Sequence, residues 1–435
     1  MLLKLLISKE RSRFRFYLLF SLLLLLLFLD YALLISIPSL AYVGVFICVA
    51  LFGDKDEIIS VCICCIPLCT AIDWQYVVIF CCAIFLFKYG KSVKLDWGFL
   101  PLVLIVIWEF LHCFFEEANL KSMIAYAFVY LFFIILFFIR DIQMIDYSFI
   151  IRNFSGTVFC VCCILTLRLL IHSNFNFDIA FFDMQRLGLA DEEIGGLIIN
   201  PNSLGVQCVI AVGGLTQIRS VGQKKSIDVF LIVLILVLGA LTCSRTYLAC
   251  LLILGIFLLV TSKTNAKGKL KLLLASIFAL LIAILLLYLV FPNVLEAFVM
   301  RFKEEDITSG RDDIFAVYNN YLFSSVKALF WGLGSLNLVN GVMKLEIVNN
   351  VPHNGVQEIL VAWGVIGLLL FILMIFVLIR RSRQENPHQS WINYSLFLVL
   401  IAKIMVGQVI TSIYTMLLFA LVYLSLCQDL RSKRI

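Results

Sequence analysis

The sequence is poor in charged residues. They make up only 14% of the 435 residues, against about 25% in soluble proteins, whereas 63% of the residues are hydrophobic. So few polar residues cannot cover the water-facing surfaces of the roughly three domains that this length would otherwise suggest. The composition therefore excludes an ordinary soluble globular protein, and it indicates an all-α polytopic membrane protein.

Residues for several kinds of chemistry are also scarce. Only four histidines occur, none at zinc-ligand spacing from a cysteine pair, so we expect no metal site. The absence of P-loop, GxGxxG and GxSxG motifs argues against nucleotide hydrolysis, dinucleotide binding and serine hydrolysis. One D-x-D pair, Asp54-Lys55-Asp56, lies in a short predicted cytoplasmic turn without other candidate residues, so we expect no sugar-nucleotide site there. The 15 cysteines fall mostly within apolar runs, which predicts packing as small hydrophobic side chains.

Long apolar segments dominate what remains. A helix needs about 20 apolar residues to cross a membrane. Up to fourteen segments are candidates, and because the second to fourth are short, twelve spans is an alternative. The basic stretch 4–15 precedes an apolar run without an A-x-A cleavage site, so it predicts a first transmembrane helix and no cleaved signal peptide. The predicted spans are 17–37, 39–53, 57–71, 75–88, 97–115, 122–139, 148–172, 203–218, 227–242, 247–262, 270–291, 356–379, 391–407 and 411–428.

The basic residues sort by side when the N-terminus is placed in the cytoplasm. Cytoplasmic segments then hold 23 of the 34 Lys and Arg residues, external segments hold eight, and the spans hold three. This bias follows the positive-inside rule, so we expect both termini to be cytoplasmic. The basic residues are spread along the chain, and nucleic acid is therefore not an expected partner. The eight external ones need another explanation.

Two external segments are long enough to carry function or structure of their own. They define four regions: N-terminal spans 1–172, central spans 173–291 with the external loop 173–202, a large external loop 292–355, and C-terminal spans 356–435. Apolar residues at helical spacing in the large loop predict an amphipathic helix, either on the membrane surface or in a soluble cap. They are Ile314, Phe315, Val317, Tyr318, Tyr321 and Leu322.

Three arginines on the predicted outer side are candidates for binding an anionic ligand. Arg245 interrupts two apolar runs where the chain turns, and a guanidinium there would bind phosphate oxygens or snorkel to headgroups. Arg311 follows a glycine in a polar break, where a salt bridge with Asp312 is the alternative. Arg186 lies in the outer loop, fourteen residues before Asn200-Pro201-Asn202, a motif that also predicts a helix start capped by Asn202.

A histidine precedes the long apolar run near the C-terminus. An unperturbed histidine titrates near ~6.5, so His353 at a helix entrance is a candidate proton acceptor, with a structural role as the alternative. Asn354 follows it directly. Glu358 lies inside the next predicted span, where an ionised carboxylate is costly unless it is paired or faces water.

Other charges lie within the predicted spans. Arg152 and Arg168 are near the two ends of one span and are predicted to snorkel. Lys403 is nearer a span centre, so we expect it to pair or to line a cavity. Glu109 is a similar buried charge without an evident partner in the sequence.

These motifs, in this order, resemble the O-antigen polymerase and O-antigen ligase superfamily of bacterial envelope glycan assembly. The resemblance covers about 185 to 370, and the first 180 residues are similar only in being hydrophobic. The matching motifs are Arg186…Gly188, Asn200-Pro201-Asn202…Gly205, Ser244-Arg245-Thr246, Ser309-Gly310-Arg311, Gly332-Leu333-Gly334 and His353-Asn354…Glu358…Gly364…Gly367.

The resemblance implies a fold like that of GT-C-type polyprenyl-dependent glycosyltransferases, in the bacterial cytoplasmic (inner) membrane. A glycan on undecaprenyl diphosphate is moved to an acceptor sugar hydroxyl on the outer side, without a nucleotide, metal or other cofactor. The implied partners are this donor, the glycan acceptor, membrane lipids and a chain-length regulator protein. The implied catalytic residues are His353, Arg311 and Arg245, and the expected substrate-binding residues are Arg186, Arg245, Arg311, Asn354, Glu358 and Asn202.

Three functions remain open at this point. The lead is a polymerase that joins lipid-linked repeat units into O-antigen or capsular polysaccharide by an inverting displacement, because Asn200-Pro201-Asn202 and the Phe- and Cys-rich chain look more like polymerases. The second is the ligase that moves a finished glycan onto lipid A-core. The third is a flippase or transporter of lipid-linked sugar, which would predict inverted repeats and charges near the bilayer midplane.

Overall fold

The computed structural model describes most of the chain. The side chains of some positions within its helices, Arg311 among them, lie outside this description. The described ranges are 2–68, 74–93, 100–115, 142–177, 186–188, 196–262, 265–290, 311–334, 354–409 and 414–428, with residues 135, 139, 180, 292, 295–296, 299–300 and 352 between them.

Within these ranges the structure is helical, and the one extended pairing is an isolated bridge between Val93 and Ile139. The prediction of an all-α membrane protein is thereby confirmed. Short π or 3-10 turns occupy 28–32, 66–68, 90–92, 142–144 and 391–394. The α-helices are α1 Leu2–Leu27, α2 Ser39–Phe52, α3 Lys55–Cys64, α4 Trp74–Tyr89, α5 Leu100–Phe115, α7 Tyr147–His172, α9 Pro201–Ser220, α10 Ser226–Ala240, α11 Arg245–Thr261, α12 Ala266–Val290, α14 Arg311–Leu322, α15 Val326–Phe330, α17 Gly355–Glu385, α18 Ser395–Val406 and α19 Tyr414–Cys427.

The predicted spans agree with these helices. Each one overlaps a described helix except 122–139, which falls almost entirely outside the described residues. Among the described residues, three helical segments are long and apolar enough to cross a membrane, namely Arg13–Ala32, Tyr147–His172 and Gly355–Glu385, and six apolar helices are shorter. The total of 12 to 14 spans stays a prediction.

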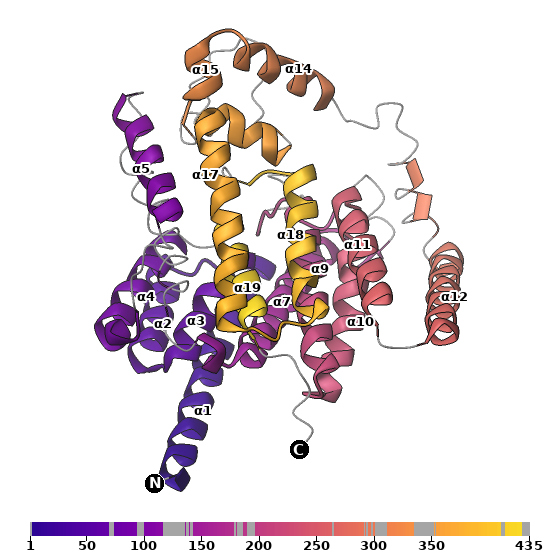
Figure 1. Ribbon diagram of the computed structural model, residues 1–435. Helices are drawn as coiled ribbons and strands as arrows, with labels where there is room; N and C mark the ends of the chain where they lie inside the picture. Colours follow the sequence, from indigo (N-terminus) through magenta and orange to yellow (C-terminus); the bar gives the residue numbers. More distant parts are fainter. Residues whose placement is uncertain are drawn as a thin grey trace.

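The helices form a bundle with two distinct ends. α7 and α10 pack against α9, α11 packs against α9 and α18, and α19 lies within the bundle, buried along its whole length. The N-terminus of α1 is at one end, and α14 and α15 cover the start of α17 at the other (Figure 1). We call the second of these the cap end.

Ion pairs join helices at the end opposite the cap. The Arg13 guanidinium lies 2.8 Å from the carboxylate of Asp56, and the Arg152 guanidinium lies 2.8 Å from that of Asp228, which is fully buried. The prediction that Arg152 snorkels is therefore wrong, because the carboxylate of α10 binds it within the protein. Asp54 caps α3 by accepting a hydrogen bond from the Glu57 amide at 2.9 Å, which gives the D-x-D pair a structural role.

α17 is not one continuous helix. Gly364 interrupts it with φ +65° and ψ −170°, a backbone conformation that is essentially restricted to glycine. The carbonyls of Val361 and Ala362 instead accept hydrogen bonds from the amides of Leu333 at 2.9 Å and Gly334 at 2.7 Å. The predicted span 356–379 therefore contains a break that the sequence did not reveal, and the Gly332-Leu333-Gly334 motif docks on the break.

Aromatic side chains fasten the break to α5. The Trp363 indole donates to the Glu109 carboxylate at 2.5 Å, and the Trp108 indole donates to the Trp363 carbonyl at 3.0 Å. Each ring nitrogen of His112 lies 2.8 Å from a carbonyl oxygen, one of Trp108 and one of Trp331. Glu109, for which the sequence offered no evident partner, is therefore bound by Trp363.

The predicted amphipathic helix in the large loop is confirmed as α14. Ile314, Tyr318 and Leu322 are buried, and burial raises the pKa of the Tyr318 phenol, which stays neutral near pH 7. The Gln357 amide ties α14 to α17 by donating to the Phe315 carbonyl at 2.8 Å. The choice between membrane surface and soluble cap stays open.

Candidate functional site

Three segments that are far apart in the sequence meet at the cap end. The Leu187 amide donates to the Leu241 carbonyl at 3.0 Å, and the Ile199 amide donates to the Gly188 carbonyl at 3.1 Å. Gly188 has φ +101°, and a Cβ atom there would lie 2.3 Å from the Ile199 carbonyl oxygen. A glycine is therefore needed for the segment 186–188 to contact both of the other two segments.

The side chains of these segments form one hydrogen-bonded group. The Arg186 guanidinium donates to the Thr242 carbonyl at 3.2 Å and to the Asn202 side-chain oxygen at 3.3 Å. The Ser244 hydroxyl donates to the same Asn202 oxygen at 2.7 Å. The segments around Arg186, Asn202 and Ser244, which the sequence analysis selected separately, are therefore joined by hydrogen bonds. These bonds hold the Arg186 guanidinium beside the turn that carries Arg245.

Two helices begin at this point. The side chain of Asn200, rather than that of Asn202, caps α9 by accepting from the Asn202 amide at 2.9 Å, so the predicted capping residue is wrong and the Asn202 side chain is used elsewhere. Ser244 caps α11 by accepting from the Tyr247 amide at 3.2 Å. A Cβ atom on Gly205 would lie 2.8 Å from the Cβ of Tyr247, so glycine lets the two helix starts approach closely.

Arg245 is the first residue of α11 and is half-buried. The residue before it, Ser244, donates a hydrogen bond to Asn202. The residue after it, Thr246, lines a hollow between α9, α11, α18 and α19. The predicted position of Arg245, at a turn between two apolar helices, is confirmed. Its role as a ligand-binding residue stays a prediction.

The hollow has a cavity volume of about 30 Å³ and opens to the surface. It lies between the starts of α9 and α11, the end of α18 and the start of α19, and we call it the α9–α19 hollow. Polar side chains make up much of its wall. The lining residues are Asn200, Asn202, Ser203, Val206, Thr246, Lys403, Val406, Gly407, Gln408 and Tyr414.

Lys403 lines this hollow, as the sequence predicted for a lysine within a span. Its ammonium donates to the Gln408 carbonyl and to the Thr415 hydroxyl, the latter at 2.6 Å. It also lies 5.1 Å from the centre of the Tyr414 ring and interacts electrostatically with the Glu358 carboxylate.

The start of α17 adjoins the same loop. Glu358 is fully buried and its carboxylate accepts a hydrogen bond from the Val409 amide. Asn354 caps α17 by accepting from the Val356 amide at 2.9 Å, and its side-chain amide donates to the Met405 carbonyl at 3.2 Å. Both predicted residues thus contact the segment that closes the α9–α19 hollow.

Two predicted catalytic residues cannot be placed in this arrangement. His353 lies outside the described residues, between Pro352 and Asn354. Arg311 is described only as the first residue of α14. Tyr414 and Gln408 line the hollow and were missed, because a tyrosine at a helix start and a glutamine in a short turn carry no distinctive sequence signal.

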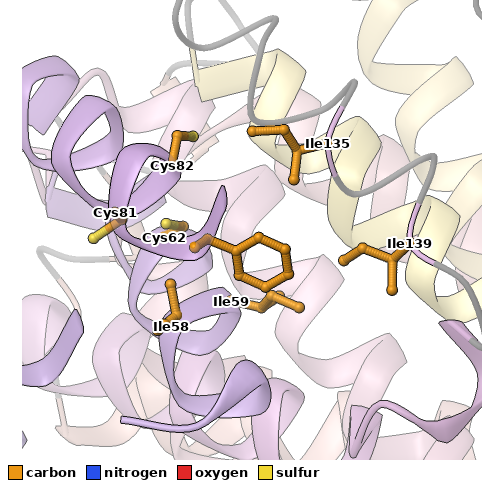
Figure 2. Close-up of a pocket in the computed structure, with 8 residues that line it drawn as sticks. Ile58, Ile59, Cys62, Cys81, Cys82, Ile135 and Ile139 are labelled. Atoms are coloured by element: carbon orange, nitrogen blue, oxygen red, sulfur yellow. The ribbon is translucent and has the colours of Figure 1, made fainter. Parts of the chain in front are cut away.

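A second hollow, of about 10 Å³, is apolar and is lined mainly by side chains of α3 and α4 (Figure 2). Its lining includes the thiols of Cys62, Cys81 and Cys82 together with isoleucine and phenylalanine side chains. The cysteines whose side chains the structure describes form no disulfide and most of them are buried, and no group of three metal-ligating side chains occurs among the described residues. The interpretation of these cysteines as packing residues is consistent with this environment.

The fold and the site together define a class: a helical membrane protein whose arginine-bearing polar site is assembled from helix starts at one end of the bundle. Residues 230–372 match the model of a family described as O-antigen ligase. This match confirms the resemblance to the O-antigen polymerase and ligase superfamily, and no curated protein matches the chain.

The matched region contains Arg245, Arg311, His353, Asn354 and Glu358. It ends in α17 beyond the break, so the family motif includes both the docking segment and the helix on which it docks. The match supports a membrane enzyme of the O-antigen ligase and polymerase type. The family implies lipid-linked glycans as its substrates and membrane lipids as its surroundings.

Proposed function

We propose that this protein polymerises undecaprenyl-diphosphate-linked oligosaccharide repeat units into O-antigen or capsular polysaccharide. The reaction takes place on the outer side of the bacterial cytoplasmic membrane, with both termini in the cytoplasm. The observation that supports it best is the joining of Arg186, Asn202 and Ser244 beside Arg245 at the cap end. A chain-length regulator protein is the further partner we propose.

The diphosphate leaving group of the donor explains why the site needs arginines. Breaking the bond between the anomeric carbon and the donor's diphosphate leaves negative charge on that diphosphate. A guanidinium keeps its charge in a low dielectric and matches phosphate oxygens with a planar fork of donors. Arg245 and Arg186 lie in the same hydrogen-bonded turn region, and we assign Arg311 of the large loop the same role.

The acceptor needs a base. The hydroxyl oxygen of the acceptor sugar attacks the anomeric carbon, its proton passes to a neutral His353, and undecaprenyl diphosphate departs. A single displacement of this kind inverts the anomeric centre and requires no metal ion. We assign Asn354 and Glu358 to the glycan side of the same site, because both contact the segment 405–409 that closes the α9–α19 hollow.

Surface glycan from the native host tests this proposal. Arg245→Ala, Arg311→Ala and His353→Ala should each abolish the long polysaccharide ladder while a single repeat unit stays attached to its anchor. Lys224→Ala, an exposed residue in the loop between α9 and α10, is the control and should give a normal ladder.

The family description makes ligase the second candidate. Loss of all surface attachment, including the single repeat unit, would support the ligase in place of the polymerase. Normal ladders from all three site variants, at protein levels equal to those of the parent, would contradict the mechanism.

A further inference from the structure

The wall of the α9–α19 hollow contains two helix starts. Two helices of more than ten residues, α9 and α11, begin at its wall, and their first residues leave backbone N–H groups and a partial positive charge at that end. The hollow is lined there by Asn200, Asn202, Ser203 and Thr246, all of which carry polar groups. Helix starts of this kind favour phosphate or carboxylate groups.

A buried cation completes the wall. Lys403 has 3% of its surface exposed, and an ammonium in an apolar helix is costly unless it has partners or faces a polar space. An ammonium carries three N–H donors, and two of them are accounted for by Gln408 and Thr415. The third donor is therefore available to a ligand oxygen in the hollow that Lys403 lines.

A second polar group near this wall also lacks a partner. Gln207 lies one helical turn after Ser203 on α9, is fully buried, and has neither of its amide atoms hydrogen-bonded within the described structure. Buried carboxamides are nearly always hydrogen-bonded in folded proteins, so an unpaired one indicates a missing polar partner. Gln207 is not itself a lining residue, so it marks an unsatisfied polar position one helical turn from the wall at Ser203.

We propose that the α9–α19 hollow binds an anionic oxygen group of the lipid-linked glycan, with Lys403 as its cationic ligand. This inference rests on the proposed function and extends it, because Lys403 lies outside the segment that matches the family. The anionic group has two sources, namely the diphosphate of the donor and the carboxylate of an acidic sugar. Asn202 belongs both to this hollow and to the Arg186 group, so a bound diphosphate would reach both.

The competing explanation is a purely structural charge pair between Lys403 and Glu358. In that case Lys403→Met is harmful because it leaves the buried Glu358 carboxylate without its counter-charge. Lys403→Met combined with Glu358→Gln removes both charges and should restore a stable, anion-responsive protein. If Lys403 binds the ligand, the double variant regains thermal stability but not binding.

Thermal unfolding of the purified full-length protein in detergent separates these explanations. The probes are inorganic pyrophosphate for the diphosphate and glucuronate for the sugar carboxylate, because a ligand that binds the folded state raises Tm. We expect one of them to raise the Tm of the parent, with binding weakened on the order of thirtyfold or more in Lys403→Met and in the double variant. Lys88→Met is the matched control, since that ammonium also binds carbonyls but lies outside the hollow.

Each outcome has one meaning. A response to pyrophosphate that depends on Lys403 identifies the diphosphate as the ligand, and a Lys403-dependent response to glucuronate alone identifies an acidic sugar. No response of the parent to either probe, or equal responses of the parent and Lys403→Met, overturns the proposal. So does a double variant whose response returns to that of the parent.

The host assay shows which proposal fails if one does. Loss of the ladder in Arg245→Ala together with a normal ladder in Lys403→Met would overturn the role of Lys403 and leave the polymerase proposal standing. A normal ladder in Arg245→Ala would count against the polymerase mechanism, whatever the binding measurements give.

Discussion

Substituting Gly364 with alanine should detach the segment 332–334 from the break in α17. The φ of +65° and ψ of −170° at this residue lie in a region that costs a non-glycine residue about 1–3 kcal/mol. A Cβ atom would also lie 2.3 Å from the Phe330 carbonyl oxygen, which belongs to the backbone and cannot rotate away. The docking segment must then move, and the hydrogen bonds from Leu333 and Gly334 are lost.

The size of the effect follows from these contributions. Two hydrogen bonds contribute about 1 kcal/mol each, so together with the backbone strain the variant should lose about 3–5 kcal/mol. That is a large part of the 5–15 kcal/mol that is typical of folded proteins. The lost stability is local to the docking segment 332–334. In the sequence this segment lies between Arg311 and His353, so activity should fall with it.

Thermal unfolding of the purified protein and the ladder in the host both measure this effect. Gly364→Ala should lower Tm and shorten the ladder more strongly as the growth temperature rises. Gly255→Ala, within α11, is the control: no atom lies within 4 Å of its added Cβ, and alanine favours a helix over glycine by about 1 kcal/mol. Equal Tm values for Gly364→Ala and the parent would refute the argument about the break.

Three further predictions concern other parts of the bundle. Arg152→Met should lower stability by about 3–5 kcal/mol, because it strands the buried Asp228 carboxylate, and adding Asp228→Asn should restore much of the loss in Tm. Ser244→Gly keeps most of the capping of α11 but loses the hydrogen bond to Asn202 of α9, whereas Ser244→Ala loses both. We expect both variants to give an equally weakened ladder, and a normal ladder from Ser244→Gly would show that the hydrogen bond does not matter. A membrane-impermeant maleimide should label Ser324→Cys but not Lys224→Cys in intact cells lacking an outer-membrane barrier, and the reverse pattern would contradict the orientation.

The spans could be predicted because their physical cause is local. A run of about 20 apolar residues favours a membrane helix wherever it occurs, and charged or polar interruptions fix its ends. The starts of α9, α11 and α17 fall within a few residues of the predicted ones, because Asn200, Ser244 and Asn354 are all capping residues. The break at Gly364 was missed because its cause is not local: the partner segment lies some thirty residues upstream in the sequence.

The site shows the same division. Arg186 and Arg245 could be selected because arginine on the outer side contradicts the orientation bias. That Arg186 binds Asn202 could not be read from a spacing of sixteen residues, since a long loop allows many arrangements. Arg152 was misjudged, and no partner could be named for Glu109, for a related reason: their partners Asp228 and Trp363 come from helices that are distant in sequence.

The parity of the spans explains why the motifs gather in one place. α9, α11 and α17 are each preceded by a connecting segment at the cap end, so all three helices begin there. A helix start needs a capping side chain, and Asn200, Ser244 and Asn354 provide it. The same starts direct backbone N–H groups toward one region, which suits an anionic substrate. In each of the motifs Asn-Pro-Asn, Ser-Arg-Thr and His-Asn, one residue therefore ends the loop and caps the helix, and it stands within two positions of a residue that we assign to the substrate under the proposed function.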